Sequence, residues 1–300
     1  MKLILILKEG ICDNLYRNYP NMNIMRFNYI KMLLKKNKKV DWLSRSLCYP
    51  FFSMEYKKMD KEALLRRNGM CQEEYEWIKS YKDLYKGERC FIVATGPSLT
   101  TDDLDKIKDE YSFSMNSGAL CFNETLWRPD FYFCQDEYVY GKIRNVVENL
   151  SQQDLPNVWV SDSIKKKYVI PGRFNVFPLH YLDHKMNHKK GYGEFKFSSD
   201  CYSCIYDAYT VTFSAMQMAC YMGFKEIYLL GCDCNYNVPK AHFIEYGHKD
   251  PKAAIMGDKM IVAHKEFKKF ADMIGVKVIN CTRGGMLEVY PREKIEEIIV

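Results

Sequence analysis

The sequence Cys90-Phe91-Ile92-Val93-Ala94-Thr95-Gly96-Pro97-Ser98-Leu99 runs from four apolar residues into a glycine-proline turn. A short apolar run before a turn is typical of a strand buried in a parallel sheet. Thr100-Thr101-Asp102-Asp103 follows and supplies a hydroxyl N-cap and acidic first-turn residues for a helix, which we expect to reach Glu110. The segment therefore predicts a strand, a turn and a helix in direct succession.

The same alternation of short apolar runs and amphipathic segments continues along the chain. We expect strands at Tyr111–Met115, Asp130–Cys134, Val158–Val160, Phe174–Phe177, Glu226–Leu230 and Val276–Ile279. We expect helices at Val139–Leu150, Ala208–Met222, Lys259–Ile274 and Arg292–Ile299. The pattern predicts an α/β protein with a Rossmann-like, doubly wound and mainly parallel sheet.

The first part of the chain has a different character. Residues 1–88 are basic and helical in pattern, and the boundary falls near Lys86-Gly87-Glu88. We therefore expect an N-terminal helical extension at 1–88 and a Rossmann-like nucleotide-binding transferase domain at 89–300. A lid segment is expected at about 234–258.

Charge and hydropathy limit the partners of the chain. The net charge of +6 is modest for 300 residues, and no aromatic platform accompanies the basic residues, so we expect no nucleic-acid partner. Residues 26–45 carry seven basic residues against one acid, which fits either contact with an anionic membrane or a solvated helix face. The aliphatic run Leu3–Leu7 is too short for a membrane helix or a signal peptide. We expect a cytoplasmic protein, peripheral to the membrane where the basic segment binds it.

The cysteines allow two interpretations. The pairs Cys201/Cys204 and Cys232/Cys234 fit either a zinc site or small buried side chains, and neither has a second pair at zinc-finger spacing. Asp103-Leu104-Asp105 imitates a metal-binding Asp-x-Asp but falls in the first turns of the predicted helix, where acids favour the dipole. We expect core thiols and no metal or other cofactor.

Polar residues follow several predicted strands. They are Asn116, Gln135, Asp136 and Asp233. Carboxyl ends of parallel strands lie on one edge of a sheet, so these side chains should converge with the Gly96 turn on one crevice. The turn fits either an anion cradle or a plain turn, and it has neither the dinucleotide-binding nor the P-loop glycine pattern.

Distant motifs together carry a family resemblance. The motifs are Gly96-Pro97-Ser98-Leu99, Asn116, Gly223-Phe224-Lys225-Glu226-Ile227-Tyr228-Leu229-Leu230-Gly231-Cys232-Asp233, Ala241-His242-Phe243 and Gly247-His248. From about Glu88 to Pro291 the chain resembles bacterial sialyltransferases of glycosyltransferase family 42 and the related family 115 of unknown function, which includes the MptE-like pterin diphosphokinases.

The sialyltransferase resemblance implies a metal-independent, inverting glycosyltransferase with a CMP-activated sugar as donor co-substrate. It implies a glycan or glycolipid acceptor, a role in surface polysaccharide or glycolipid synthesis, and a homo-oligomer. It assigns the general base to His248 and the earlier histidine position to His242. Tyr236 lies beside the position from which a family tyrosine supports the leaving phosphate, and it fits either that role or packing. The resemblance places the nucleotide against Thr95, Gly96, Pro97, Ser98, Asn116, Thr210, Val211, Thr212 and Asp233. The predicted strand ends add Gln135 and Asp136, whose side chains fit either hydrogen bonds to a ribose or base or capping of the strand ends.

Two departures leave the donor sugar open. Thr95 stands where the sialyltransferases carry asparagine, and Thr210-Val211-Thr212 replaces their Thr-Ser-Gly. The MptE-like relatives imply an alternative, an ATP-dependent diphosphokinase that needs Mg²⁺. A non-catalytic nucleotide-binding protein is a third interpretation.

Overall fold

The computed structural model describes residues 38–186, 195–236, 238–247 and 253–299. The chain divides into two compact units, Met1–Lys61 and Glu62–Val300. The second unit contains the sheet, and everything below concerns that unit unless stated. The predicted boundary between extension and domain near residue 88 stays a prediction.

The sheet of this unit has seven strands, all parallel, in the order β5-β4-β3-β2-β1-β8-β9. These strands are β1 (Arg89–Val93), β2 (Ser112–Met115), β3 (Phe131–Cys134), β4 (Val158–Ser161), β5 (Asn175–Phe177), β8 (Glu226–Leu230) and β9 (Lys277–Asn280). A second sheet pairs β6 (Leu179–His180) with β7 (Ile205–Tyr206). The seven predicted strands are confirmed to within about two residues.

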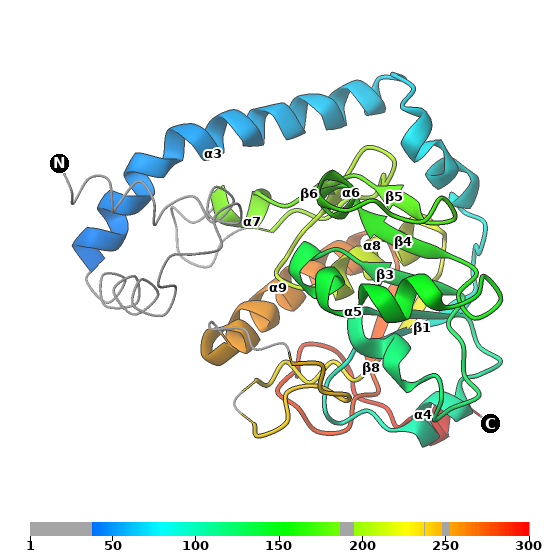
Figure 1. The fold of residues 1–300 in the computed structure, drawn as a ribbon. Helices are drawn as coiled ribbons and strands as arrows, with labels where there is room; N and C mark the ends of the chain where they lie inside the picture. Colours follow the sequence, from blue (N-terminus) through cyan, green and yellow to red (C-terminus); the bar gives the residue numbers. More distant parts are fainter. Residues whose placement is uncertain (1–37, 187–194, 237, 248–252, 300) are drawn as a thin grey trace. The chain divides into compact units, whose positions relative to one another are not determined.

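Helices connect the strands. The α-helices are α3 (Lys38–Arg67), α4 (Thr101–Lys106), α5 (Glu137–Asn149), α6 (Asp162–Lys167), α7 (Asp183–Met186), α8 (Thr212–Tyr221), α9 (Ala253–Met273) and α10 (Ile295–Ile298). The 3₁₀ helices are η2 (Glu73–Tyr81) and η3 (Asn116–Cys121). Figure 1 shows α5 on the near side of the sheet and α8, drawn fainter, on the far side.

The strand order confirms the doubly wound fold. The chain builds β1 to β5 outward in one direction, then returns to place β8 on the free side of β1 and continues outward to β9. Neighbouring strands that lead away in opposite directions leave a crevice at their carboxyl ends. The crevice expected for a ligand therefore lies where β1 and β8 end.

The strands are apolar because both faces of the sheet are covered. Every residue of β2, β3 and β4 is buried, and so are the last four residues of β1 and of β8. Strands buried on both faces lose the alternation of apolar and polar residues, which is why continuous apolar runs located them in the sequence.

Several predicted helix bounds are wrong. The helix after the glycine-proline turn ends at Lys106 rather than Glu110, and the one predicted from Ala208 begins at Thr212. The predicted helix from Lys259 begins at Ala253, inside the predicted lid, and the last helix covers only Ile295–Ile298. Apolar spacing locates the middle of a helix, whereas capping contacts set its ends.

The part of α3 within this unit is anchored to the domain by a buried arginine. Arg66 donates from Nε to the Ser203 carbonyl at 2.7 Å and from Nη1 to Gln72 at 2.8 Å. Of the segment predicted to meet a membrane, residues 26–37 lie outside the described residues, and membrane contact stays a prediction. Within the described residues, no helix has the length and apolar character needed to cross a bilayer.

Candidate functional site

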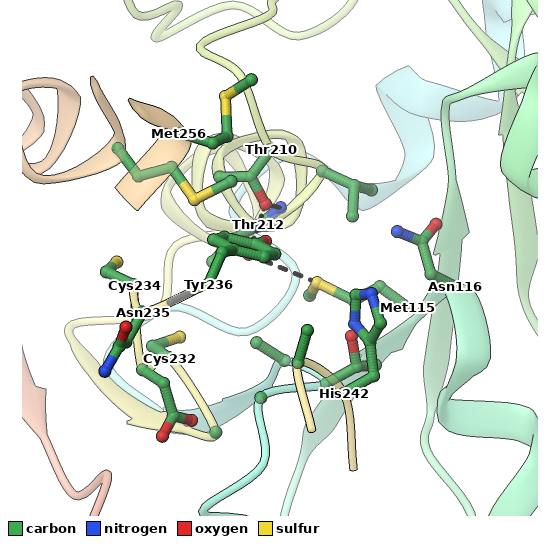
Figure 2. Close-up of a pocket in the computed structure, with 18 of the residues that line it drawn as sticks. Met115, Asn116, Thr210, Thr212, Cys232, Cys234, Asn235, Tyr236, His242 and Met256 are labelled. Atoms are coloured by element: carbon green, nitrogen blue, oxygen red, sulfur yellow. Dashed lines mark hydrogen bonds between the residues drawn. The ribbon is translucent and has the colours of Figure 1, made fainter. Parts of the chain in front are cut away.

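A cavity of about 480 Å³ lies at the carboxyl ends of β1 and β8, where the fold predicts a ligand. It is lined by twelve of the residues predicted for the site, namely Thr95, Gly96, Pro97, Asn116, Gln135, Asp136, Thr210, Val211, Thr212, Asp233, Tyr236 and His242. Figure 2 shows the side chains of Tyr236, His242 and Asn116 around it. The structure therefore brings these residues together, while their roles stay predictions.

The floor of the cavity is a close crossing, in which the backbone at the end of β1 lies in direct contact with the backbone at the end of β8. The N–H of Ala94 donates to the Leu230 carbonyl and that of Gly96 to the Gly231 carbonyl, both at 2.9 Å. A methyl group on Gly96 would lie 2.4 Å from the Gly231 oxygen. Glycine is therefore required at position 96 because the neighbouring strand passes too closely for any side chain.

Ser98 joins the two sides of this crossing. It is absent from the cavity lining, but its hydroxyl donates to Asp233 Oδ2 at 2.8 Å. Burial raises the pKa of Asp233, and hydrogen bonds from the Ser98 hydroxyl and backbone N–H partly oppose the rise. The serine therefore holds the carboxylate at the edge of the cavity.

The glycine-proline turn has fewer free amides than an anion cradle needs. The N–H groups of Ala94 and Gly96 are used in the crossing, Pro97 has none, and Leu99 donates to the Gly96 carbonyl at 3.3 Å. Helix α4 is capped by a reciprocal Thr100–Asp103 box. These groups of the turn position the strand ends, and phosphate binding at the turn stays a prediction.

Helix α8 offers hydrogen-bond donors on another wall of the cavity. Thr210, Val211 and Thr212 line the cavity at its N-terminus, and its Val211 N-cap makes no side-chain capping bond. The hydroxyls of Thr210 and Thr212 lie 3.0 Å apart (Figure 2). The N–H groups of Thr212 and Phe213 already donate to the Thr210 hydroxyl and carbonyl. This terminus therefore offers an anion its two hydroxyls and the positive end of the helix dipole.

Asn116 has an unsatisfied group beside the cavity. Its side-chain Oδ1 is buried without a hydrogen-bond partner among the described residues, and its φ of 47° lies in the left-handed region. The Tyr132 hydroxyl donates to the Asn116 carbonyl and holds the backbone there. A buried amide oxygen without a partner costs free energy, and a ligand donor would remove that cost.

Gln135 and Asp136 have structural partners as well as cavity positions. The Gln135 amide donates to Asp207 at 2.9 Å and accepts from the Ser214 hydroxyl at 2.6 Å. The Asp136 carboxylate caps α5 by accepting from the N–H groups of Tyr138 and Val139. Gln135 therefore orients Asp207, a cavity residue that the sequence did not identify.

Several described residues of the segment predicted as a lid line the cavity, among them Val238, His242 and Tyr246. The Phe243 N–H donates to the Thr95 carbonyl at 2.8 Å and ties the lid to the glycine-proline turn. The His242 ring lies 5.3 Å from that of Tyr246 and 6.2 Å from that of Tyr236, centroid to centroid. His248, the predicted base, lies outside the described residues.

The charges on the described lining all have one sign. They belong to four carboxylates, Asp136, Asp207, Asp233 and Glu245. Repulsion from these groups rises with the charge of the ligand. The lining therefore favours a ligand with one negative charge over a nucleoside triphosphate without a cation.

Backbone strain is concentrated here. Among the described non-glycine residues, four have positive φ, and three of them, Asn116, Tyr209 and Cys234, line the cavity. Left-handed residues of this kind persist only where the surroundings enforce them, and they cluster at functional sites. Tyr209 and His264 are further lining residues that the sequence did not identify.

The cysteine pairs are buried on different parts of the domain. Cys201 and Cys204 are fully or nearly fully buried, and burial raises the pKa of both thiols. Cys232 and Cys234 line the cavity. In the part of the chain that the structure describes, no three His, Cys, Asp or Glu side chains are grouped closely enough to hold a metal ion.

These features define an α/β protein of the Rossmann-like class with a ligand cavity at the switch point of its parallel sheet. A family model described as 6-hydroxymethylpterin diphosphokinase MptE-like matches residues 68–239. The chain belongs to this MptE-like family, as the sequence motifs indicated. Among curated proteins, no match was found.

Similar solved structures include two glycosyltransferases. One is the MAf glycosyltransferase from Magnetospirillum magneticum AMB-1, with a TM-score of 0.43, 17% identity and coverage of 75% of this chain. The chain spans only 38% of that protein's length. The other is the sialyltransferase CstII from Campylobacter jejuni in complex with the substrate analogue CMP-3FNeuAc, with a TM-score of 0.43, 15% identity and coverage of 68% of this chain and 85% of that chain.

Proposed function

We propose that the protein is a metal-independent, inverting glycosyltransferase that takes its sugar from a CMP-activated donor held in the switch-point cavity. The observation that supports it best is the meeting of polar groups in one cavity: Asn116, whose Oδ1 has no hydrogen-bond partner among the described residues, and the hydroxyls of Thr210 and Thr212 at the start of α8. A ribose hydroxyl or a base amine is the kind of donor that this oxygen requires.

In the proposed reaction the acceptor hydroxyl attacks the anomeric carbon of the donor sugar. The bond from that carbon to the phosphate oxygen breaks, and CMP leaves with the electron pair. His248 takes the hydroxyl proton, because neutral histidine is available near pH 7. Thr210, Thr212 and Tyr236 stabilise the departing phosphate, and the acceptor is a surface polysaccharide or glycolipid.

A second candidate is an ATP-dependent diphosphokinase, favoured by the MptE-like family match and by the four cavity carboxylates. Moving a diphosphate requires cations to offset the triphosphate charge, and carboxylates are suitable ligands for Mg²⁺. The two candidates therefore differ in nucleotide and in metal requirement.

Thermal-shift measurements with CMP, CDP, ATP and GTP, each with and without Mg²⁺, separate them. We expect CMP to stabilise the protein without Mg²⁺, and Asn116→Ala to weaken CMP binding by roughly tenfold through loss of one buried hydrogen bond. Asn116→Gly is the matched variant for the backbone, because glycine tolerates the positive φ. Stabilisation only by ATP with Mg²⁺ would support the diphosphokinase, and CMP release from CMP-sugars tests the transfer itself.

A further inference from the structure

His264 is a buried histidine in the cavity wall that the proposed reaction does not use. It lies on α9, one turn after Met260 and two turns after Met256, and all three line the cavity. Its side chain is 1% exposed, and its ring lies 4.5 Å from that of Phe213. Burial lowers its pKa to about 3, so the ring is neutral at physiological pH.

Tyr290 fixes the position of the single ring proton. Its Oη lies 3.0 Å from His264 Nδ1 and 3.1 Å from the His264 backbone oxygen. Burial raises the pKa of Tyr290 far above its usual value, so the hydroxyl keeps its one proton. Two short contacts therefore have to be satisfied by one tyrosine proton and one imidazole proton.

Only one arrangement gives each contact a proton. The Tyr290 hydroxyl donates to the backbone oxygen, which as a carbonyl can accept a second hydrogen bond, and His264 Nδ1–H donates to Tyr290 Oη. The reverse arrangement, with the tyrosine proton on Nδ1, leaves two oxygens 3.1 Å apart with no proton between them. The imidazole is therefore protonated at Nδ1, and Nε2 carries a lone pair.

We infer that His264 presents an acceptor-only Nε2 to the cavity and selects ligands that place a neutral N–H or O–H donor against it. Nε2 has no hydrogen-bond partner among the described residues, and the Nδ1 edge of the ring is occupied by Tyr290. A lone pair repels phosphate oxygens, so the group recognised is a base amine or a sugar hydroxyl. Tyr290 acts as a positioning residue, and the identity of the nucleotide rests on the proposed function.

The proton position can be measured on the free full-length protein by NMR with ¹⁵N-labelled histidine. We expect His264 to show a protonated Nδ1 and an unprotonated Nε2, and Tyr290→Phe to populate the Nε2–H form. A protonated Nε2 in the unliganded wild type would overturn the inference, whether or not any nucleotide binds. Failure of CMP to bind would overturn the proposed donor and leave this measurement unaffected.

Calorimetric affinities for CMP, UMP and 2′-deoxy-CMP then identify the donor group. His264→Phe keeps a ring without an acceptor and should weaken CMP binding roughly 5- to 20-fold. If His264→Phe weakens the binding of CMP but not of UMP, the donor is the base amine. If it weakens the binding of CMP but not of 2′-deoxy-CMP, the donor is the ribose hydroxyl. If ATP with Mg²⁺ is the ligand instead, ITP replaces UMP in the comparison. Unchanged affinity of His264→Phe for the ligand that binds refutes the contact.

Discussion

Gly96→Ala should break the hydrogen bonds that join the backbone after β1 to the backbone after β8. The added Cβ would lie 2.0 Å from Asp233 Oδ2 and 2.4 Å from the Gly231 carbonyl oxygen. The aspartate side chain can rotate away, but the Gly231 oxygen belongs to backbone that the Gly96 N–H holds at 2.9 Å. The strand ends must therefore move apart.

The cost follows from the bonds that are lost. The Gly96–Gly231 hydrogen bond contributes about 1 kcal/mol, and the Ser98–Asp233 bond to a carboxylate about 1.5–3 kcal/mol. We therefore expect a destabilisation of about 2.5–4 kcal/mol, which for a domain of this size lowers Tm by roughly 5–15 °C. CMP binding should be lost as well, because the cavity floor is displaced.

Urea unfolding and calorimetry on wild type and variant measure this effect. Gly172→Ala is the matched control, since Gly172 is exposed and a Cβ there has no atom within 4 Å. The control should stay within about 1 kcal/mol of wild type. A Gly96→Ala protein as stable as Gly172→Ala would refute the close-crossing account.

Two further predictions concern buried charges. Arg66→Ala should cost about 2–3 kcal/mol in unfolding free energy, because it removes charged hydrogen bonds to Ser203 and Gln72, whereas the exposed Arg67→Ala should cost under about 0.5 kcal/mol by urea unfolding. Burial raises the pKa of Asp233, so its protonated form stabilises the fold below the ordinary aspartate pKa, and this contribution is lost as pH rises through the raised value. Asp233→Asn cannot ionise, so its unfolding free energy should increase relative to that of the wild type as pH rises above the ordinary aspartate pKa of about 4, and a pH-independent difference would contradict the shift.

The sheet was predictable because buried parallel strands are continuous apolar runs bounded by polar residues. The polar residues after the strands, such as Asn116 and Asp233, were found for the same reason. Parallel strands place their carboxyl ends on one edge, so position in the chain was enough to bring them together.

Other parts of the site could not be read from the chain. Asp207 and Tyr209 lie on either side of Ala208, where the sequence predicted that a helix begins, so both were assigned to that helix or its edge. The helix α8 begins at Thr212, and the side chain of its N-cap residue Val211 makes no capping bond that could have indicated this start. His264 sits within an amphipathic helix, where a histidine on the apolar face is usually a core residue. The position of the proton on the His264 ring depends on Tyr290, which lies far from His264 in the sequence and contacts it only in the folded structure.

The glycine of the first turn has a different purpose here from that in dinucleotide-binding folds. In those folds glycines let backbone amides approach a pyrophosphate. In this chain the Gly96 N–H donates to the adjacent strand, and the space a side chain would need is filled by Gly231 and Asp233. The short Gly-Pro-Ser motif is thus explained by strand packing, and in the proposed function the phosphate is bound at the start of α8. In that proposal a helix terminus with two hydroxyls suits a single phosphate, and a CMP-linked donor meets less repulsion from the cavity carboxylates than a nucleoside triphosphate without a cation.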